Sequence, residues 1–162
     1  MDMTKIANFA LYAIENDTAS LNDKKLSIML FLIDNESVEK NGAKIFGDQY
    51  IKSARNPEPK QLTDIFEIIA NDEDLEDDDE RLYMIQELLA FVDIEIFDKK
   101  SFVELKFSKF EEEFDPSIFT KDELSLIDDI LAKYKDMTPR NIANACFKIE
   151  KVRQTPNGEV II

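Results

Sequence analysis

The sequence predicts an α+β fold that is mainly α-helical, with about five to six helices and a small antiparallel β-hairpin near residues 93–107. Three observations predict this class. Apolar residues recur at the spacing of a helical face through most of the chain, and this spacing changes to strict alternation over 93–107. Only three glycines and five prolines interrupt the regular segments. With 162 residues, 44% of them apolar, we expect one domain spanning residues 1–162.

The first half of the chain carries four helical patterns. The first helix follows Thr4 as its capping residue, and the second begins at Asn22 or Asp23. This second segment is apolar nearly all round, which is typical of a central helix. Pro59 opens the third helix, because proline is tolerated in a first helical turn. The fourth helix covers residues 81–92.

An acidic run separates the third and fourth helices, with eight acids in the nine positions 72–80. A calcium-binding loop requires glycine at its sixth position and glutamate at its twelfth, and no aspartate of the run starts such a pattern. Acidic residues also favour the dipole at the start of a helix. We therefore expect a solvated loop that leads into the fourth helix.

Two turn signals indicate β structure. Apolar residues alternate at 94 and 96 and again at 103, 105 and 107, on either side of a turn near 98–101. This pattern predicts a hairpin with one face on the core. Near the C-terminus, the TPNG sequence at 155–158 is typical of a type I turn followed by a left-handed residue. It predicts that the end of the chain folds back as a second hairpin.

Two further helices have clear start signals. Thr120 and Glu123 form a capping-box pattern, in which each side chain bonds to the backbone N–H of the other residue. Thr138 caps the last helix and Pro139 occupies its first position. We expect this last helix to continue to about residue 152.

The charge balance argues against nucleic acid as a partner. The 20 Lys and Arg against 35 Asp and Glu give a net charge of −15, which repels a phosphate backbone. The basic residues form only short groups that lie close to acids, namely Lys24-Lys25, Lys99-Lys100 and Lys148-Lys151-Arg153. We expect no direct binding to nucleic acid.

The sequence also indicates a cytoplasmic protein without a membrane partner. No basic leader precedes an apolar stretch, and the longest purely apolar run, residues 28–33, is too short to span a bilayer. The single cysteine, Cys146, cannot form an internal disulfide. It lies in a helical apolar pattern without an obvious base, which predicts a buried structural thiol.

Histidine is absent, which excludes many catalytic mechanisms. Ser-His-Asp and Cys-His relays, most zinc sites and the usual proton shuttle near neutral pH all require it. A glycosidase could use two carboxylates, but no aromatic sugar platform is visible and tryptophan is absent. We expect no catalytic residues, no cofactor and no metal.

Three segments carry a family likeness. The segment KKLSIMLFLID at 24–34 keeps Leu26, Phe31 and Asp34 of a K-L-x-K-L-L-Y-F-x-D-like helix. FGDQYIKSARNPEP at 46–59 is similar to a G-x-x-Y segment followed by a loop with two prolines. Residues 123–150 fit an acid-rich helix, a short link and a last helix, although the His and Trp common in that helix are missing. On these motifs the chain resembles the SocA-like antitoxin family, whose shared domain is called Panacea and which includes many phage-associated proteins.

The resemblance implies a single Panacea-like domain and a non-enzymatic function. Members of the family neutralise a toxin by direct binding, and the toxin is usually encoded beside them. Some members instead deliver the toxin to a protease. DNA binding in the family tends to come from an added domain that this chain lacks. The missing His and Trp imply a divergent member, with either a changed partner or a lost role.

The segment 42–59 holds two of the three glycines and two of the five prolines. Gly42 and Gly47 permit turns with positive φ, and the prolines keep the exit from the loop extended. Two interpretations remain open. The segment is either a connector whose aromatic residues cover the core or a rigid recognition loop. Because Tyr and Arg are favoured at interface centres, the second predicts these partner-binding residues: Gly47, Asp48, Tyr50, Lys52, Arg55, Pro57 and Pro59.

A rival function follows from the acidity. A DNA-mimic inhibitor, in some cases phage-encoded, would use its carboxylates in place of phosphates to occupy the basic cleft of a nuclease or other DNA-binding protein. Such mimicry requires carboxylates in an ordered row, whereas the densest cluster, at 72–80, is expected to be a flexible loop. The favoured prediction is therefore an antitoxin that binds a protein toxin.

Overall fold

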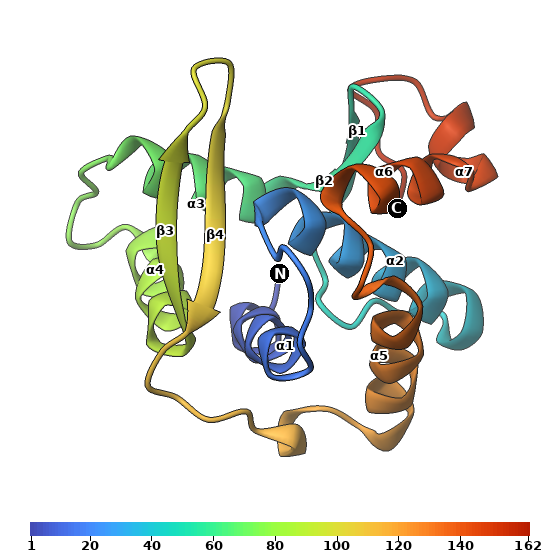
Figure 1. Ribbon diagram of the computed structural model, residues 1–162, viewed down its shortest axis with the longest axis horizontal. Helices are drawn as coiled ribbons and strands as arrows, with labels where there is room; N and C mark the ends of the chain where they lie inside the picture. Colours follow the sequence, from blue (N-terminus) through green and yellow to red (C-terminus); the bar gives the residue numbers. More distant parts are fainter.

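The computed structural model describes all 162 residues and has the predicted mainly α-helical α+β architecture (Figure 1). The α-helices are α1 (Met3–Glu15), α2 (Asp23–Asn41), α3 (Lys60–Asn71), α4 (Glu80–Phe91), α5 (Lys121–Tyr134), α6 (Pro139–Phe147) and α7 (Glu150–Gln154). The strands are β1 (Tyr50–Ser53), β2 (Asn56–Pro59), β3 (Val92–Asp98) and β4 (Val103–Lys109), and a 3-10 helix covers Pro116–Ile118. The strands form two separate antiparallel pairs.

Helix α2 is central, as its nearly continuous apolar surface predicts. Its side chains from Lys25 to Asn35 are all buried, and it packs against β2, β4, α5 and α6. Asn22 is the cap, because its side-chain oxygen accepts the backbone N–H of Lys25 (2.8 Å). Gly42 ends the helix with φ +75°, which confirms the predicted left-handed turn.

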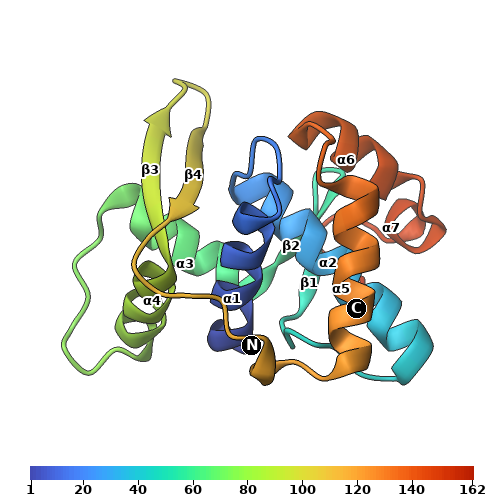
Figure 2. The same cartoon turned by 60° about the horizontal axis from the view of Figure 1, so that its bottom comes forward.

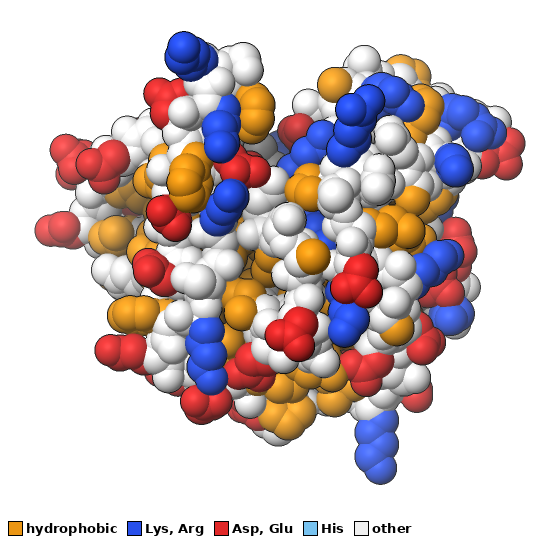
Figure 3. Space-filling view, viewed as in Figure 1, with side chains coloured by type: hydrophobic (Ala, Val, Ile, Leu, Met, Phe, Trp, Pro, Cys, Tyr) orange, Lys and Arg blue, Asp and Glu red, His pale blue; other side chains and the backbone are white.

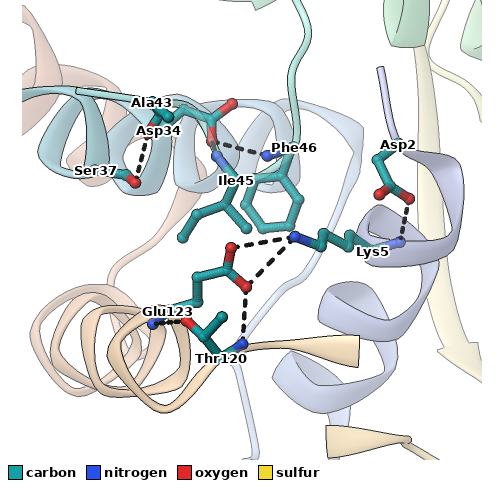
Figure 4. Close-up of polar contacts among 9 residues, drawn as sticks. All are labelled: Asp2, Lys5, Asp34, Ser37, Ala43, Ile45, Phe46, Thr120 and Glu123. Carbon is teal, nitrogen blue, oxygen red and sulfur yellow. Dashed lines mark hydrogen bonds and ion pairs between the residues drawn. The ribbon is translucent and has the colours of Figure 1, made fainter. Parts of the chain in front are cut away.

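Helix α1 lies between the β3–β4 side of the molecule and α5, as Figures 1 and 2 both show. Its cap is Asp2, whose carboxylate accepts the backbone N–H of Lys5 (3.0 Å). The prediction of Thr4 as the cap is therefore wrong: the helix begins at Met3, and the Thr4 hydroxyl bonds to Glu87 of α4 instead. The Lys5 ammonium reaches across to Glu123 of α5 (3.2 Å), so an ion pair joins the two helices (Figure 4).

Strands β1 and β2 form a hairpin inside the segment predicted as a connector or loop. On its other edge β1 meets the end of the chain: Tyr50 accepts from the Ile161 N–H and donates to the Ile162 carbonyl (2.8 and 2.9 Å). The turn predicted at 155–158 is present, with Gly158 at φ +85°. The predicted second hairpin is wrong, however, because the residues after this turn pair with distant β1 rather than with their own neighbours.

The prolines of β2 fit this sheet. The Lys60 N–H donates to the Gln49 carbonyl (2.8 Å). Because backbone N–H groups alternate in direction along a strand, those of Glu58 and Asn56 also point toward β1. Pro57 and Pro59 occupy the alternate positions, where an N–H would point to the free edge of the sheet. Their missing donors therefore cost no ladder bond, and they prevent a further strand from pairing there.

The hairpin predicted near 93–107 is confirmed as β3–β4, with Ile94 paired to Phe107 and Ile96 to Leu105. Its expected core-facing side is only partly correct. Leu105 and Phe107 are buried, but exposure rises toward the turn and Ile96 is 47% exposed. The physical reason is length, because the hairpin extends beyond the helices that could cover it and stands out from the molecule (Figure 1).

The predicted capping box at Thr120 and Glu123 and the cap at Thr138 are confirmed. The single last helix expected to residue 152 is instead split into α6 and α7 at Lys148 and Ile149. Cys146 is buried as predicted, and desolvation raises the pKa of its thiol to about 12. None of the helices is both long and apolar enough to cross a membrane.

Candidate protein-binding groove

An open groove of about 860 Å³ lies between the β3–β4 hairpin and the β2–α6 side. The start of α2, β2, α3, the start of α6 and the first residues of β4 line it. Figure 3 shows the depression at the top of the molecule, between two projecting parts of the surface. The groove therefore joins five elements that are distant in sequence.

Apolar side chains form the floor of the groove and one of its rims. Ile28 and Leu105 are buried in the floor, next to Phe66 of α3. Phe102 and Val103 stand on the rim, where the β3–β4 turn meets β4, and Phe102 is 60% exposed. An exposed aromatic side chain beside a partly apolar groove is typical of a protein-interaction surface.

Hydrogen bonds fix the first half of β4 to the start of α2. The Asp23 carboxylate accepts the backbone N–H of Leu105 (3.1 Å), and the Asn22 amide donates to Glu104 (2.9 Å). Farther from the turn, the Phe107 N–H donates to the Leu21 carbonyl (3.3 Å). The strand that leads away from the rim is therefore held in place, which limits the entropy that the rim would lose on binding.

The groove is predominantly acidic. Asp23, Glu58, Glu67 and Glu104 line it, against only Lys24 and Arg140. Burial raises the pKa of Glu58, and the nearby carboxylates of Glu67 and Asp23 raise it further. The pKa of Asp23 is also raised, mainly by burial. These carboxylates lie close enough to repel one another, so a cation from a partner would be attracted to them.

Tyr50, a predicted partner-binding residue, is fully buried. Its hydroxyl donates to Asp34 (2.8 Å), and its ring lies edge-on to Phe31. The same Asp34 carboxylate accepts the backbone N–H groups of Ile45 (2.7 Å) and Phe46 (3.0 Å), as the close-up partly shows (Figure 4). Burial and the Asp34 charge raise the pKa of Tyr50 well above its usual value.

The expectation that the segment presents Tyr50 and Lys52 to a partner is therefore wrong. The Tyr50 ring packs against Phe31 and its hydroxyl bonds to the buried Asp34 carboxylate, so the side chain is held in the core. Lys52 is also buried, and its ammonium donates to the Arg153 carbonyl (3.1 Å). The connector interpretation, in which Phe46 and Tyr50 cover the core, describes this part of the segment better.

Asp48 has a local structural role. Its carboxylate accepts the backbone N–H groups of Gln61 (3.1 Å) and Leu62 (3.0 Å), at the start of α3. Pro59 precedes that helix and cannot cap it through its side chain. Asp48, which lies earlier in the sequence, accepts the free N–H groups of the first turn instead. The sequence offers no local signal for this cap, because Asp48 lies well before the helix.

The remaining predicted site residues lie in three different settings. Pro59 is buried in β2, and Gly47 is exposed with φ +76°. Pro57 is one of the groove-lining residues, together with Asn56 and Glu58 of the same strand. Arg55 is exposed at the β1–β2 turn, outside the groove. The structure therefore brings only Pro57 into the groove.

Sequence reasoning missed the groove itself. Phe102 gave the only signal in the sequence. It lies in the turn before β4, where its aromatic side chain cannot join the core-facing side of the hairpin, so an exposed position was to be expected. Glu58 and Glu67 gave no signal, because nothing local distinguishes them from solvated acids. Their grouping depends on how β2, α3 and α2 pack.

Residues 72–79 of the acidic run form a largely exposed irregular loop, and Glu80 begins α4, as predicted for a loop that leads into the fourth helix. Asp79 at its end caps α4 by accepting the backbone N–H of Arg81 (2.9 Å). Hydrogen bonds from the Arg81 side chain and backbone lower the pKa of Asp79 to about 2. The run lacks the regular geometry that would hold its carboxylates in a row.

One comparison with known proteins identifies a family. The family described as "Antitoxin SocA-like, Panacea domain" matches residues 26–150. This match covers most of the chain, from the first turn of α2 to the start of α7, and includes all groove-lining residues except Asn22, Asp23 and Lys24. No significant match was found among curated proteins or among solved structures.

Proposed function

We propose that this chain, which belongs to the SocA-like antitoxin family with a Panacea domain, neutralises a protein toxin by binding it in the groove. Family membership supports an antitoxin function. The observation that carries the choice of site is Phe102, a largely exposed aromatic side chain on the rim of this groove. Large aromatic side chains supply much of the binding energy at protein interfaces, because they bury a large area at a small entropy cost.

The groove chemistry defines the kind of toxin segment that fits. Apolar side chains of the toxin would pack against Phe102, Val103 and the Ile28 floor. A Lys or Arg beside them would meet Glu58 and Glu67, where carboxylates outnumber cations. The toxin segment is therefore expected to combine apolar residues with at least one positive charge.

The activity requires no chemistry on the toxin. The chain has no histidine and its single thiol is buried with a raised pKa, which supports a binding function rather than catalysis. We propose a non-enzymatic protein of the cytoplasm that uses no cofactor and no metal. Delivery of the bound toxin to a protease is compatible with the same groove.

The experiment starts from the reading frame next to this gene, whose product is the candidate toxin. That product should arrest growth when expressed alone, and co-expression with this chain should relieve the arrest. Phe102→Ser should weaken the purified complex by about 2 kcal/mol in calorimetric titration, the scale of an interface hot spot. A stable toxin level during relief would indicate neutralisation by binding, and a falling level would indicate proteolysis.

Tyr83→Ser is the matched control. Tyr83 is a similarly exposed aromatic residue (61%) on α4, outside the groove. Its replacement should leave the affinity unchanged. Equal losses from the two variants, or no complex with the wild-type chain, would rule out the groove as the toxin site.

A DNA mimic remains the second candidate, because the net charge is −15 and the run 72–80 is exposed. Mimicry would hold a basic partner mainly through charge, so affinity would fall by about a thousandfold between low and moderate salt. Binding through an apolar groove should lose much less. Titration at two salt concentrations distinguishes the two functions.

A further inference from the structure

Two cations lie over the Phe147 ring at the end of α6, and hydrogen bonds to the backbone connect them to two more. Arg55 lies over the Phe147 ring, with its guanidinium carbon 4.2 Å from the ring centre, and the Lys52 ammonium lies 5.5 Å from the same centre. Lys52 donates to the carbonyl of Arg153, whose guanidinium donates to the carbonyl of Lys148. We call Lys52, Arg55, Lys148 and Arg153 the cationic face. Figure 3 shows Lys and Arg side chains gathered over β1 and α6 at the upper right.

This face is unusual in a chain with so many acids. None of the ion pairs in the molecule includes any of its four cations. Residues 52–55 contain no acid, and residues 147–159 contain only Glu150 and Glu159. The Glu150 carboxylate accepts a hydrogen bond from the Gln154 side chain. Although the sequence has 35 acids, none of them forms an ion pair with these four cations, so the cationic face keeps a local positive charge.

Arg55 is held in position before any partner arrives. Stacking on Phe147 orients the planar guanidinium and leaves its N–H edge open, because Arg55 itself is exposed. The preceding residue, Ala54, has φ +54°, a left-handed conformation that is strained for a residue with a side chain. The two-residue turn between β1 and β2 therefore projects Arg55 in one defined direction.

We propose that the cationic face binds an acidic peptide segment of a protein partner through carboxylates. Arg55 would hold one carboxylate with two parallel N–H bonds, the geometry that a planar guanidinium favours. Lys148 and Arg153 are exposed and would contact flanking acids, while the buried Lys52 would add charge without contact.

The surroundings favour a short acidic segment over a nucleic acid. Charges are screened beyond about 8 Å at physiological salt, so a short segment experiences mainly the local positive face. A nucleic-acid strand would extend past the face onto a surface where acids outnumber basic residues. Its regularly spaced phosphates would be repelled there.

The experiment measures binding of two labelled probes by fluorescence anisotropy: a short peptide of consecutive glutamates and a single-stranded oligonucleotide of matched charge. The wild-type chain should bind the peptide more tightly than the oligonucleotide. Arg55→Ala combined with Lys148→Ala should weaken peptide binding by about tenfold or more, and Arg55→Lys alone by a smaller factor, since it keeps the charge but loses the paired N–H bonds.

Lys99→Ala combined with Lys100→Ala is the control, because it removes the same charge from the distant β3–β4 turn. It should leave peptide affinity within about twofold of wild type, as expected for screened charges. Equal losses from both double variants, tighter binding of the oligonucleotide, or no peptide binding would each overturn the proposal. No toxin is used, so the outcome is independent of the groove function.

Discussion

The two β-hairpins have similar secondary structure but contrasting environments. In β1–β2, Tyr50 is fully buried, its hydroxyl bonds to Asp34, and the end of the chain pairs along the outer edge of β1. In β3–β4, Asp23 and Leu21 hold the middle of β4, and the turn carries the exposed Phe102. The first hairpin is stabilised by the core, whereas the second presents part of its apolar surface to solvent.

The difference shows which apolar residues are available for binding. A tyrosine or phenylalanine contributes to recognition only if the fold leaves it unpartnered. Tyr50 has an aromatic neighbour and a buried carboxylate, so its apolar area is already used. Phe102 lies at the end of a hairpin that outreaches the helices, and its area is still free. Each prediction below tests one side of this contrast.

The largest effect is expected from Asp34→Ala. The substitution would leave the buried N–H groups of Ile45 and Phe46 and the Tyr50 hydroxyl without an acceptor. Because each unsatisfied buried group carries a desolvation penalty, unfolding free energy should fall by about 3 kcal/mol or more. Chemical denaturation measures this value, and Asp34→Asn, which keeps one acceptor oxygen, should lose less. A loss below about 1 kcal/mol would show that Asp34 does not secure the first hairpin.

A smaller effect is expected from Tyr50→Phe. It removes only the hydroxyl and leaves one Asp34 oxygen without this donor, so unfolding free energy should fall by about 1–2 kcal/mol. The affinity of the folded protein for the proposed toxin should not change, since Tyr50 is inaccessible. Thermal unfolding and calorimetric titration of the same sample separate the two quantities. Lower affinity with unchanged stability would restore Tyr50 as a recognition residue.

Local chemistry explains what the sequence could predict. The caps at Asn22, Thr120 and Thr138 bond to groups three residues away, and the β3–β4 pattern alternates within one short segment. The fate of Tyr50 depends instead on Asp34, 16 residues earlier, and on Ile161 near the end of the chain. No spacing within residues 42–59 contains that information.

The candidate groove was unpredictable for the same reason. Glu58 of β2 and Glu67 of α3 become neighbours of Asp23 only through packing against α2. Arg55 is exposed at its turn, but its position over Phe147 depends on parts of the chain that are far apart in sequence. The sequence therefore drew attention to single residues, such as Pro57 in the groove and Arg55 in the cationic face, but it did not show which residues the fold brings together there.

The smallest effect on stability is expected from Ile96→Ala, and it tests the second hairpin most sharply. Ile96 pairs across the strands with Leu105, and the two side chains share one face of the sheet, yet Ile96 is 47% exposed and Leu105 only 1%. Leu105→Ala should cost about 2–5 kcal/mol, because it opens a cavity in the core. Ile96→Ala should cost no more than about 0.5 kcal/mol, since its site is already largely hydrated. Chemical denaturation of both variants under one set of conditions gives the comparison. Similar losses would mean that the outer part of β3–β4 is stabilised by the core after all, and the contrast between the two hairpins would no longer hold.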